Sequence, residues 1–228
     1  MAGSVKIGSL ILDGAPRVAV VIDRPLPGQE IAGLAGRGAD LLEIRFDLFA
    51  DGLVAAIDYA SAIREHTALP LLGTLRENDS NRADRLSAFE RLIPLVDAVD
   101  IEVDADIRDA VVQAAAGKTV VVSEHDFGGM PDNARLEELV AQSVAAGADI
   151  AKIAGTATER EDAARLLTFC SRCQHPMVAI AMGRFGAASR LLGSLFGSLF
   201  TYSFVSEAVA PGQIGLEELV ADLRRYYP

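Results

Sequence analysis

Val120-Val-Val-Ser-Glu-His-Asp-Phe127 and Ala148-Asp-Ile-Ala-Lys-Ile-Ala-Gly155 are two short apolar runs that flank a segment with helical periodicity, Ala134–Ala146. Each run is rich in aliphatic residues and is bounded by polar or glycine residues, which is typical of a buried strand. A strand, a helix and a second strand in succession form a βαβ unit, whose two strands run parallel. These residues therefore predict an α/β fold built on a parallel sheet.

Runs of the same kind recur at regular intervals through the chain of 228 residues, with helical periodicity between them. Eight such repeats in a chain of this length predict a (β/α)8 TIM barrel. The predicted strands are Arg17–Ile22, Asp40–Arg45, Pro70–Arg76, Val99–Val103, Thr119–Ser123, Asp149–Ala154, Met177–Met182 and Phe200–Val205. The clearest helices between them are Leu53–Glu65, Ala83–Val96, Ile107–Ala116, Ala134–Ala146 and Glu159–Ser171.

A doubly wound sheet is the competing architecture, and it usually has a glycine-rich turn after its first strand. Here that position has the sequence Val21-Ile-Asp-Arg-Pro-Leu-Pro-Gly28, which argues against a dinucleotide site. The opening residues Val5–Leu12 precede the first barrel strand, and we expect them to form a β-hairpin that closes the bottom of the barrel. No linker divides the chain, so residues 1–228 are predicted to form a single barrel domain.

The net charge of −11 and the isoelectric point near 4.7 argue against a nucleic-acid partner, which requires a basic face. The longest apolar segment, Leu191–Val205, is interrupted by glycine and serine and is too short to span a bilayer. The first residues lack the pattern of a secretory signal. We therefore expect a cytoplasmic protein with no membrane partner.

The two cysteines, Cys170 and Cys173, form a lone C-x-x-C at the end of a predicted helix. Two thiols make only half of a zinc site, and a redox pair normally opens a helix instead of closing one. We assign no function to this pair and predict no metal site.

Polar side chains gather at the carboxyl ends of the predicted strands, where a barrel carries its catalytic groups. Side chains two residues apart on a strand share a face, and these groups recur in phase while the opposite face stays apolar. They are Glu43, Arg45, Asp47, Thr74, Arg76, Glu102, Ser123, His125, Lys152 and Met182. Carboxylates, arginines, a histidine and a lysine at one mouth predict a site for an anionic, carbonyl-bearing small molecule.

Lys152 lies within an apolar strand, and His125 ends the strand before it. Burial disfavours an ammonium group, and a free amine beside a histidine is what Schiff-base chemistry needs. On the strand alone, a lysine that reaches solvent is an equal alternative.

Two loop residues are further candidates. Arg190, after the seventh strand, has the planar fork suited to a carboxylate, but it also fits a solvated arginine in a first helical turn. Gln213, after the eighth strand, fits either a contact with a substrate hydroxyl or a cap on its own loop.

Together these motifs resemble the type I 3-dehydroquinate dehydratase family, in the family's order and over nearly the whole chain. The motifs are E-x-R-x-D at Glu43–Asp47, T-x-R at Thr74–Arg76, D-I-E at Asp100–Glu102, S-x-H-D-F at Ser123–Phe127, K-I at Lys152–Ile153, M-x-x-x-G-x-x-S-R at Met182–Arg190, G-S at Gly197–Ser198 and A-P-G-Q at Ala210–Gln213.

The resemblance implies dehydration of 3-dehydroquinate to 3-dehydroshikimate in the shikimate pathway, without metal or cofactor, by a homodimer. Lys152 would form an imine with the ketone, and His125 would transfer protons as general acid and base. Arg190 and Gln213 would hold the substrate carboxylate. The remaining substrate-binding residues would be Glu43, Arg45, Arg76 and Met182.

The chain departs from the family pattern at two positions. Ser80 stands where the family often has the glutamate that orients the histidine, which leaves Glu102 and Glu77 as candidates for that role. Val209 stands where the family often has a serine that helps to bind substrate.

Two other functions remain open at this point. A class I aldolase or transaldolase-like barrel also needs a lysine on the sixth strand and an anionic substrate, although Gly183-Arg-Phe-Gly186 is a poor phosphate loop. A non-catalytic barrel that binds a metabolite is the second alternative, but such a protein has no need of a buried amine.

Overall fold

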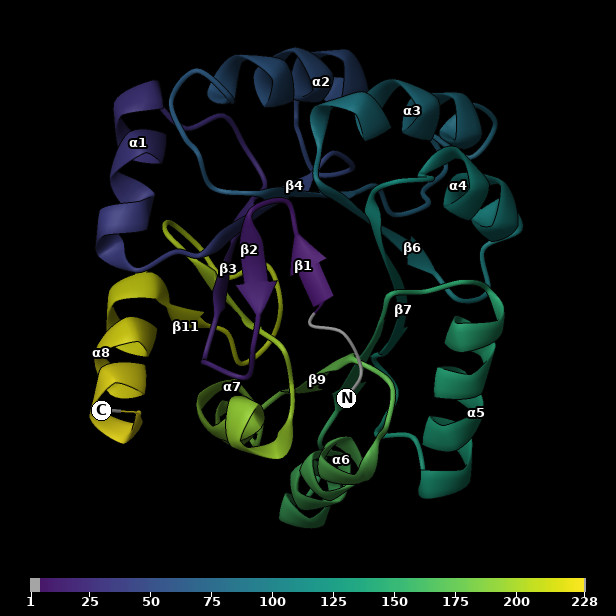
Figure 1. Ribbon diagram of the computed structural model, residues 1–228, viewed down its shortest axis with the longest axis vertical. Helices are drawn as coiled ribbons and strands as arrows, with labels where there is room; N and C mark the ends of the chain where they lie inside the picture. The colour runs from purple at the N-terminus through teal and green to yellow at the C-terminus, as the bar shows by residue number, and fades with distance from the viewer. Residues whose placement is uncertain (1–4, 228) are drawn as a thin grey trace.

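The computed structural model describes residues 5–227, and these form a (β/α)8 barrel in which a ring of helices surrounds the strands (Figure 1). All neighbouring strands of the barrel sheet are parallel. The barrel strands are β3 (Val18–Ile22), β4 (Leu41–Arg45), β5 (Leu71–Thr74), β6 (Ala98–Glu102), β7 (Thr119–Asp126), β8 (Ile150–Thr156), β9 (Met177–Met182) and β10 (Thr201–Phe204). The predicted fold class is confirmed.

The barrel closes between β9 and the residues just before β10. The strand order runs β11-β10-β3-β4-β5-β6-β7-β8-β9, where β11 is the short strand Ile214–Gly215. A parallel bridge joins Met177 at the start of β9 to Ser198 in the segment before β10, and the Leu199 amide donates to the Met177 carbonyl at 3.0 Å. Closure brings the carboxyl ends of all eight barrel strands to one mouth.

Eight α-helices pack around the outside of the strands among the described residues. Their ends carry the expected signals: the Asp132 side chain accepts from the Arg135 amide at 2.8 Å, and Glu159 and Asp162 form a capping box. None of the helices in residues 5–227 has the length and apolar character needed to cross a membrane. The helices are α1 (Gly28–Arg37), α2 (Gly52–Ile63), α3 (Arg85–Leu92), α4 (Arg108–Ala114), α5 (Asn133–Ala145), α6 (Arg160–Arg172), α7 (Ala187–Leu192) and α8 (Leu216–Tyr226), with 3₁₀ turns at Ile93–Leu95 and Gly193–Phe196.

A β-hairpin covers the amino-terminal end of the barrel, as predicted. Strands β1 (Val5–Ile7) and β2 (Leu10–Leu12) pair antiparallel and lie across the barrel opening that faces the viewer in Figure 1. Ile7 and Leu12 are buried and belong to the same apolar cluster as the inward-facing residues of the strands. The hairpin therefore fills the bottom of the barrel, and the polar groups are confined to the opposite mouth.

Candidate active site

A cavity of about 450 Å³ opens at the carboxyl ends of the barrel strands. Every barrel strand or the loop that follows it contributes to its wall, as expected for the catalytic face of this fold. Nine of the residues named from the sequence line it: Glu43, Arg45, Arg76, Glu102, His125, Lys152, Met182, Arg190 and Gln213. Asp47, Thr74 and Glu77, which were also named, are not part of its lining. The strand alternation therefore brings the predicted groups to one place.

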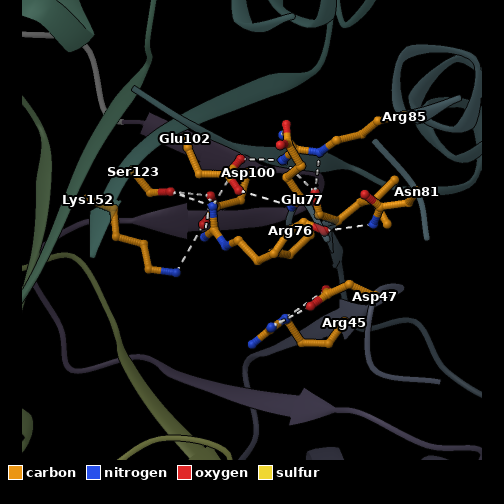
Figure 2. A network of polar contacts seen from close by, with 12 residues as sticks. Arg45, Asp47, Arg76, Glu77, Asn81, Arg85, Asp100, Glu102, Ser123 and Lys152 are labelled. Carbon is orange, nitrogen blue, oxygen red and sulfur yellow. Dashed lines mark hydrogen bonds and ion pairs between the residues drawn. The ribbon is translucent and has the colours of Figure 1, made fainter. Parts of the chain in front are cut away.

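Lys152 lies on β8 with its side chain directed into the barrel, and only 5% of the residue is exposed. Its Nζ atom lies 3.0 Å from Asp100 Oδ2 (Figure 2) and 3.7 Å from Glu43 Oε1. The alternative of a lysine that reaches solvent does not hold. Two carboxylates therefore hold the buried amine of Lys152, and the residue lines the cavity.

Asp100 is fully buried on β6 and joins three donors. Besides Lys152, it accepts from Arg76 at 2.7 Å and from Ser123 Oγ at 2.5 Å, and Arg76 also donates to Ser123 Oγ at 2.9 Å. Burial alone would raise the pKa of the Asp100 carboxyl, but the charges of Arg76 and Lys152 outweigh it and hold that pKa well below its usual range. Asp100 therefore stays ionised and positions both cations.

His125 lies on β7, two residues after Ser123, which pairs with Lys152 across the β7–β8 register. Its ring stacks on Phe127 at a centroid distance of 6.4 Å. Burial, followed by the positive charges of Arg76 and Lys152, lowers the pKa of His125 well below its ordinary value. The imidazole is therefore neutral at neutral pH and can accept a proton.

Arg190 lies on α7 and is 2% exposed, so the alternative of a solvated arginine does not hold. Its Nε and one terminal nitrogen are buried without a hydrogen-bond partner among the described residues, and the other terminal nitrogen lies 3.5 Å from the Pro211 carbonyl. Burial lowers its pKa to about 10. A buried guanidinium with free donors is suited to bind an anion that enters the cavity.

Gln213 closes its own loop and also lines the cavity. Its Oε1 atom accepts from the amides of Val209 at 2.7 Å and Ala210 at 3.3 Å. Because the oxygen is used by the loop, the NH2 group is the part of the side chain available to a ligand. Val209 lines the cavity as an apolar wall, as does the buried Met182.

Arg45 and Glu43 are held by neighbours on the same face of the sheet. Asp47 binds Arg45 through two hydrogen bonds of 3.0 and 2.6 Å, and Asp47 itself is absent from the cavity lining (Figure 2). The Thr74 hydroxyl donates to Glu43 Oε1 at 2.8 Å. Both cavity residues therefore present fixed charges to a ligand.

Glu102 points to the network around Arg76 instead of to the histidine. Its carboxylate accepts from the buried Arg85 of α3, lies 3.5 Å from Arg76, and accepts from the Glu77 amide at 3.4 Å. No hydrogen bond joins it to His125 in the part of the chain that the structure describes. The predicted role of Glu102 as the histidine orienter therefore has no support here, because two arginines compete for its carboxylate.

Glu77, the second candidate orienter, lies at the surface of this network. It forms ion pairs with Arg82 at 2.7 Å and with Arg85 at 3.7 Å. Its position beside Arg85 is visible at the right of Figure 2. Like Glu102, it is engaged by arginines of the region after β5.

Comparisons with known proteins identify the family of this chain. The family model for type I 3-dehydroquinase matches residues 18–227. The chain belongs to the type I 3-dehydroquinase family. It is 36% identical to the 3-dehydroquinate dehydratase of Methanococcoides burtonii, with 94% of this chain and 96% of the relative covered.

Solved structures of the family have the same fold. The 3-dehydroquinate dehydratase of Geobacillus kaustophilus superposes with a TM-score of 0.84 at 26% identity, covering 99% of this chain and 98% of that protein. The type I enzyme of Clostridium difficile, solved with covalently modified comenic acid, gives a TM-score of 0.85 at 26% identity over 98% of this chain and 97% of that one. This family member is therefore an enzyme of the lyase class, and the aldolase-like and non-catalytic alternatives are not supported.

Three residues important to this 3-dehydroquinase site did not stand out in the sequence. Asp100 was visible only as part of the D-I-E motif, although its parity with Glu102 places it on the inner face of β6. Arg85 belongs to α3, and nothing in a helical pattern shows that one arginine will be fully buried. Tyr202 has the parity of an inward-facing residue on β10, which was the available signal.

The two cysteines lie away from the catalytic face. Cys170 is buried, Cys173 caps the end of α6, and both are free thiols. Burial raises the pKa of the Cys170 thiol to about 12, which disfavours the reactive thiolate. Within residues 5–227, no cluster of three or more His, Cys, Asp and Glu side chains is arranged to hold a metal ion.

Proposed function

We propose that this chain converts 3-dehydroquinate into 3-dehydroshikimate through a Schiff base on Lys152, with His125 as general acid and base. The observation that carries the proposal is the buried amine of Lys152 at the floor of a polar cavity, 3.0 Å from Asp100. A buried amine with ordered partners is a costly feature, and imine chemistry accounts for it.

The charged side chains of the cavity determine the orientation of the bound substrate. The substrate carboxylate is the one group of 3-dehydroquinate that can neutralise a buried cation, and Arg190 is the cavity arginine with unpaired donors. Arg45 and Arg76 are already bound by Asp47 and Asp100. We therefore assign the carboxylate to Arg190, with the Gln213 amide beside it, and the hydroxyls to the face formed by Glu43, Arg45 and Arg76.

Imine formation places the charge where the protein already stabilises it. The Lys152 ammonium gives up a proton and its nitrogen adds to the ketone carbon to form a carbinolamine. The carbinolamine hydroxyl takes up that proton and leaves as water, and the nitrogen lone pair forms the C=N bond. The nitrogen of the resulting iminium is positive, as in the ammonium it replaces, so Asp100 and Glu43 stabilise both. The iminium withdraws electrons from the adjacent carbon and makes its C–H bond acidic.

His125 carries the protons. The neutral imidazole accepts the proton from the acidified C–H bond, and the electron pair forms an enamine. The enamine electrons then expel the substrate hydroxyl, to which the protonated imidazole returns its proton, so that water departs. A water molecule finally adds to the iminium carbon, and cleavage of the C–N bond releases the enone product and restores the Lys152 amine. General acid–base assistance of this kind is typically worth about 10²–10⁴-fold in rate.

The Clostridium difficile relative was solved with covalently modified comenic acid, which supports covalent chemistry in this family. Turnover tests the function of this chain directly. Purified protein should convert 3-dehydroquinate into a product with the ultraviolet absorbance of a conjugated enone, and Lys152→Met should abolish this conversion. If the wild-type protein leaves 3-dehydroquinate unchanged, the proposal fails.

The residues that would perform these steps come from the whole barrel, so we propose that residues 1–228 act as one catalytic domain. The homodimer and the cytoplasmic location stay predictions. Light scattering after size-exclusion chromatography tests the first, and fractionation of the source cells tests the second.

A further inference from the structure

Tyr202 is a part of the cavity wall to which the proposed mechanism gives no role. It lies on β10 with its side chain in the barrel interior, and only 5% of the residue is exposed. It lines the cavity beside Lys152. Within the described residues, its hydroxyl has no hydrogen-bond partner.

An unpaired buried hydroxyl is costly, because the group has lost its hydrogen bonds to water and gained none in return. The hydroxyl also stays a donor: burial, followed by the negative charges of Glu43 and Asp100, raises the pKa of Tyr202 well above its ordinary value. Tyr202 is therefore a neutral phenol at the wall of a polar cavity, with a buried donor that still lacks an acceptor.

The aromatic ring of Tyr202 contacts the reacting nitrogen. Lys152 Nζ lies over the ring face, 4.4 Å from its centroid. Phe200 packs edge-on against the same ring at a centroid distance of 5.5 Å and fixes its orientation. A cation over an aromatic face is stabilised by the ring quadrupole, most strongly where water is excluded.

We propose that Tyr202 is a further substrate-contacting residue of the site: its hydroxyl donates a hydrogen bond to an oxygen of the bound substrate, and its ring stabilises the positive nitrogen of the Lys152 iminium. The role of the ring rests on the proposed Schiff base, whereas the role of the hydroxyl requires only that the substrate occupies the cavity. The two parts are therefore separable by substitution.

Two variants distinguish the parts. Tyr202→Phe removes the hydroxyl and keeps the ring, so KM for 3-dehydroquinate should rise about five- to tenfold with little change in kcat. Because the variant also removes an unpaired buried group, its Tm without substrate should be equal to or higher than that of the wild type. Tyr202→Leu removes the ring as well. Its kcat should be about tenfold lower than that of Tyr202→Phe, and borohydride should trap less adduct at Lys152.

Tyr59→Phe is the matched control, since the Tyr59 hydroxyl is bound to the backbone of Leu26 at 3.1 and 3.3 Å and lies outside the cavity. It should show the opposite pattern, with a lower Tm and an unchanged KM. A hydroxyl with a purely structural role at Tyr202 would give this same pattern.

The outcomes separate this proposal from the proposed function. An unchanged KM or a lowered Tm in Tyr202→Phe overturns the role of the hydroxyl. Equal kcat and equal trapping in Tyr202→Phe and folded Tyr202→Leu overturn the role of the ring while the Schiff base stands. A wild-type enzyme that turns over 3-dehydroquinate with no adduct at Lys152 overturns the Schiff base, and the role of the ring with it.

Discussion

Lys152 Nζ and Asp100 Oδ2 lie 3.0 Å apart in the barrel interior, on strands β8 and β6, with β7 between them. The same carboxylate binds Arg76 and the Ser123 hydroxyl. Asp100 therefore fixes the position of the Lys152 amine relative to the strand that carries His125. It also balances part of the positive charge at the floor of the cavity.

Asp100→Asn should reduce kcat by about 100-fold, because a nucleophile released from its partner leaves the reactive geometry. Removing one partner from buried ion pairs should also lower the free energy of unfolding by about 3 kcal/mol. Steady-state kinetics and urea unfolding measure the two effects. Ser123→Ala keeps both ion pairs of Asp100 and should lower the free energy of unfolding by only about 1 kcal/mol. An equal loss of unfolding free energy in Asp100→Asn and Ser123→Ala would contradict the role of the Asp100 ion pairs.

Arg190→Met should raise the KM for 3-dehydroquinate by about 30- to 100-fold, since a hydrogen-bonded charge pair with the substrate carboxylate is lost. The same variant should unfold at a higher temperature than the wild type, because it removes a buried cation with unpaired donors. Calorimetry and steady-state kinetics test these opposite changes.

Arg184→Met is the control for Arg190→Met, because Arg184 is exposed on the loop before α7. It should change neither KM nor the unfolding temperature by much. If Arg190→Met binds substrate normally, the carboxylate is held elsewhere in the cavity.

The lowered pKa of His125 predicts how the enzyme depends on pH. In the proposed mechanism catalysis needs the neutral imidazole, so the acidic limb of kcat/KM should lie below pH 6.5, the ordinary histidine value. The free energy of unfolding also depends on the protonation of this histidine. The unfolded histidine binds a proton below about pH 6.5 while buried His125 stays neutral, so the free energy of unfolding decreases as the pH falls below that value.

As the pH falls from neutral toward the lowered pKa of His125, His125→Asn should lose less free energy of unfolding than the wild type does. The turnover of this variant should be greatly reduced. The half-buried His175 also has a lowered pKa, but it is present in both proteins and cancels in the comparison. An acidic limb above pH 6.5 would be inconsistent with a desolvated catalytic histidine.

Gly212→Ala should disturb the loop that carries Gln213. Gly212 has a φ of +79°, and a Cβ atom there would lie 2.6 Å from the Gly183 carbonyl oxygen. A left-handed conformation costs an alanine about 1–2 kcal/mol before any clash is relieved. We expect a several-fold rise in KM and a Tm lower by about 3 °C or more.

Gly129→Ala, in the loop after β7, is the control for Gly212→Ala. A Cβ atom at Gly129 would meet nothing within 4 Å, and the φ of Gly129 is not in the left-handed region. It should leave KM unchanged. Equal effects of the two alanine substitutions would show that the contact between Gly212 and Gly183 does not position the loop.

Sequence patterns predict most of this fold because buried parallel strands have a local signature. The runs at Thr119–Ser123 and Asp149–Ala154 contain aliphatic residues on both faces, as a strand covered by helices requires. Their inward parity also predicts which charged residues meet at the mouth. The structure extends β7 to Asp126, so that His125 is part of the strand itself.

The pairing of charges within the site was not predictable in the same way, because it depends on helices and loops whose positions relative to the strands are set by packing. Glu102 has the parity of a site residue, but Arg85 reaches it from α3. Arg190 looks like an ordinary helical arginine until α7 is seen packed against β9 and β10, which buries it. Distances across the barrel, such as that between Lys152 and Asp100, appear only in three dimensions.

The most direct test of the Schiff-base mechanism is borohydride reduction of the enzyme in the presence of 3-dehydroquinate, followed by peptide mass spectrometry. If Lys152 forms an imine, reduction should inactivate the enzyme irreversibly, and the ligand mass should appear on the peptide that contains Lys152. Lys152→Met, and wild-type enzyme treated without substrate, should carry no adduct. An active enzyme whose Lys152 stays unmodified after this treatment would contradict the mechanism.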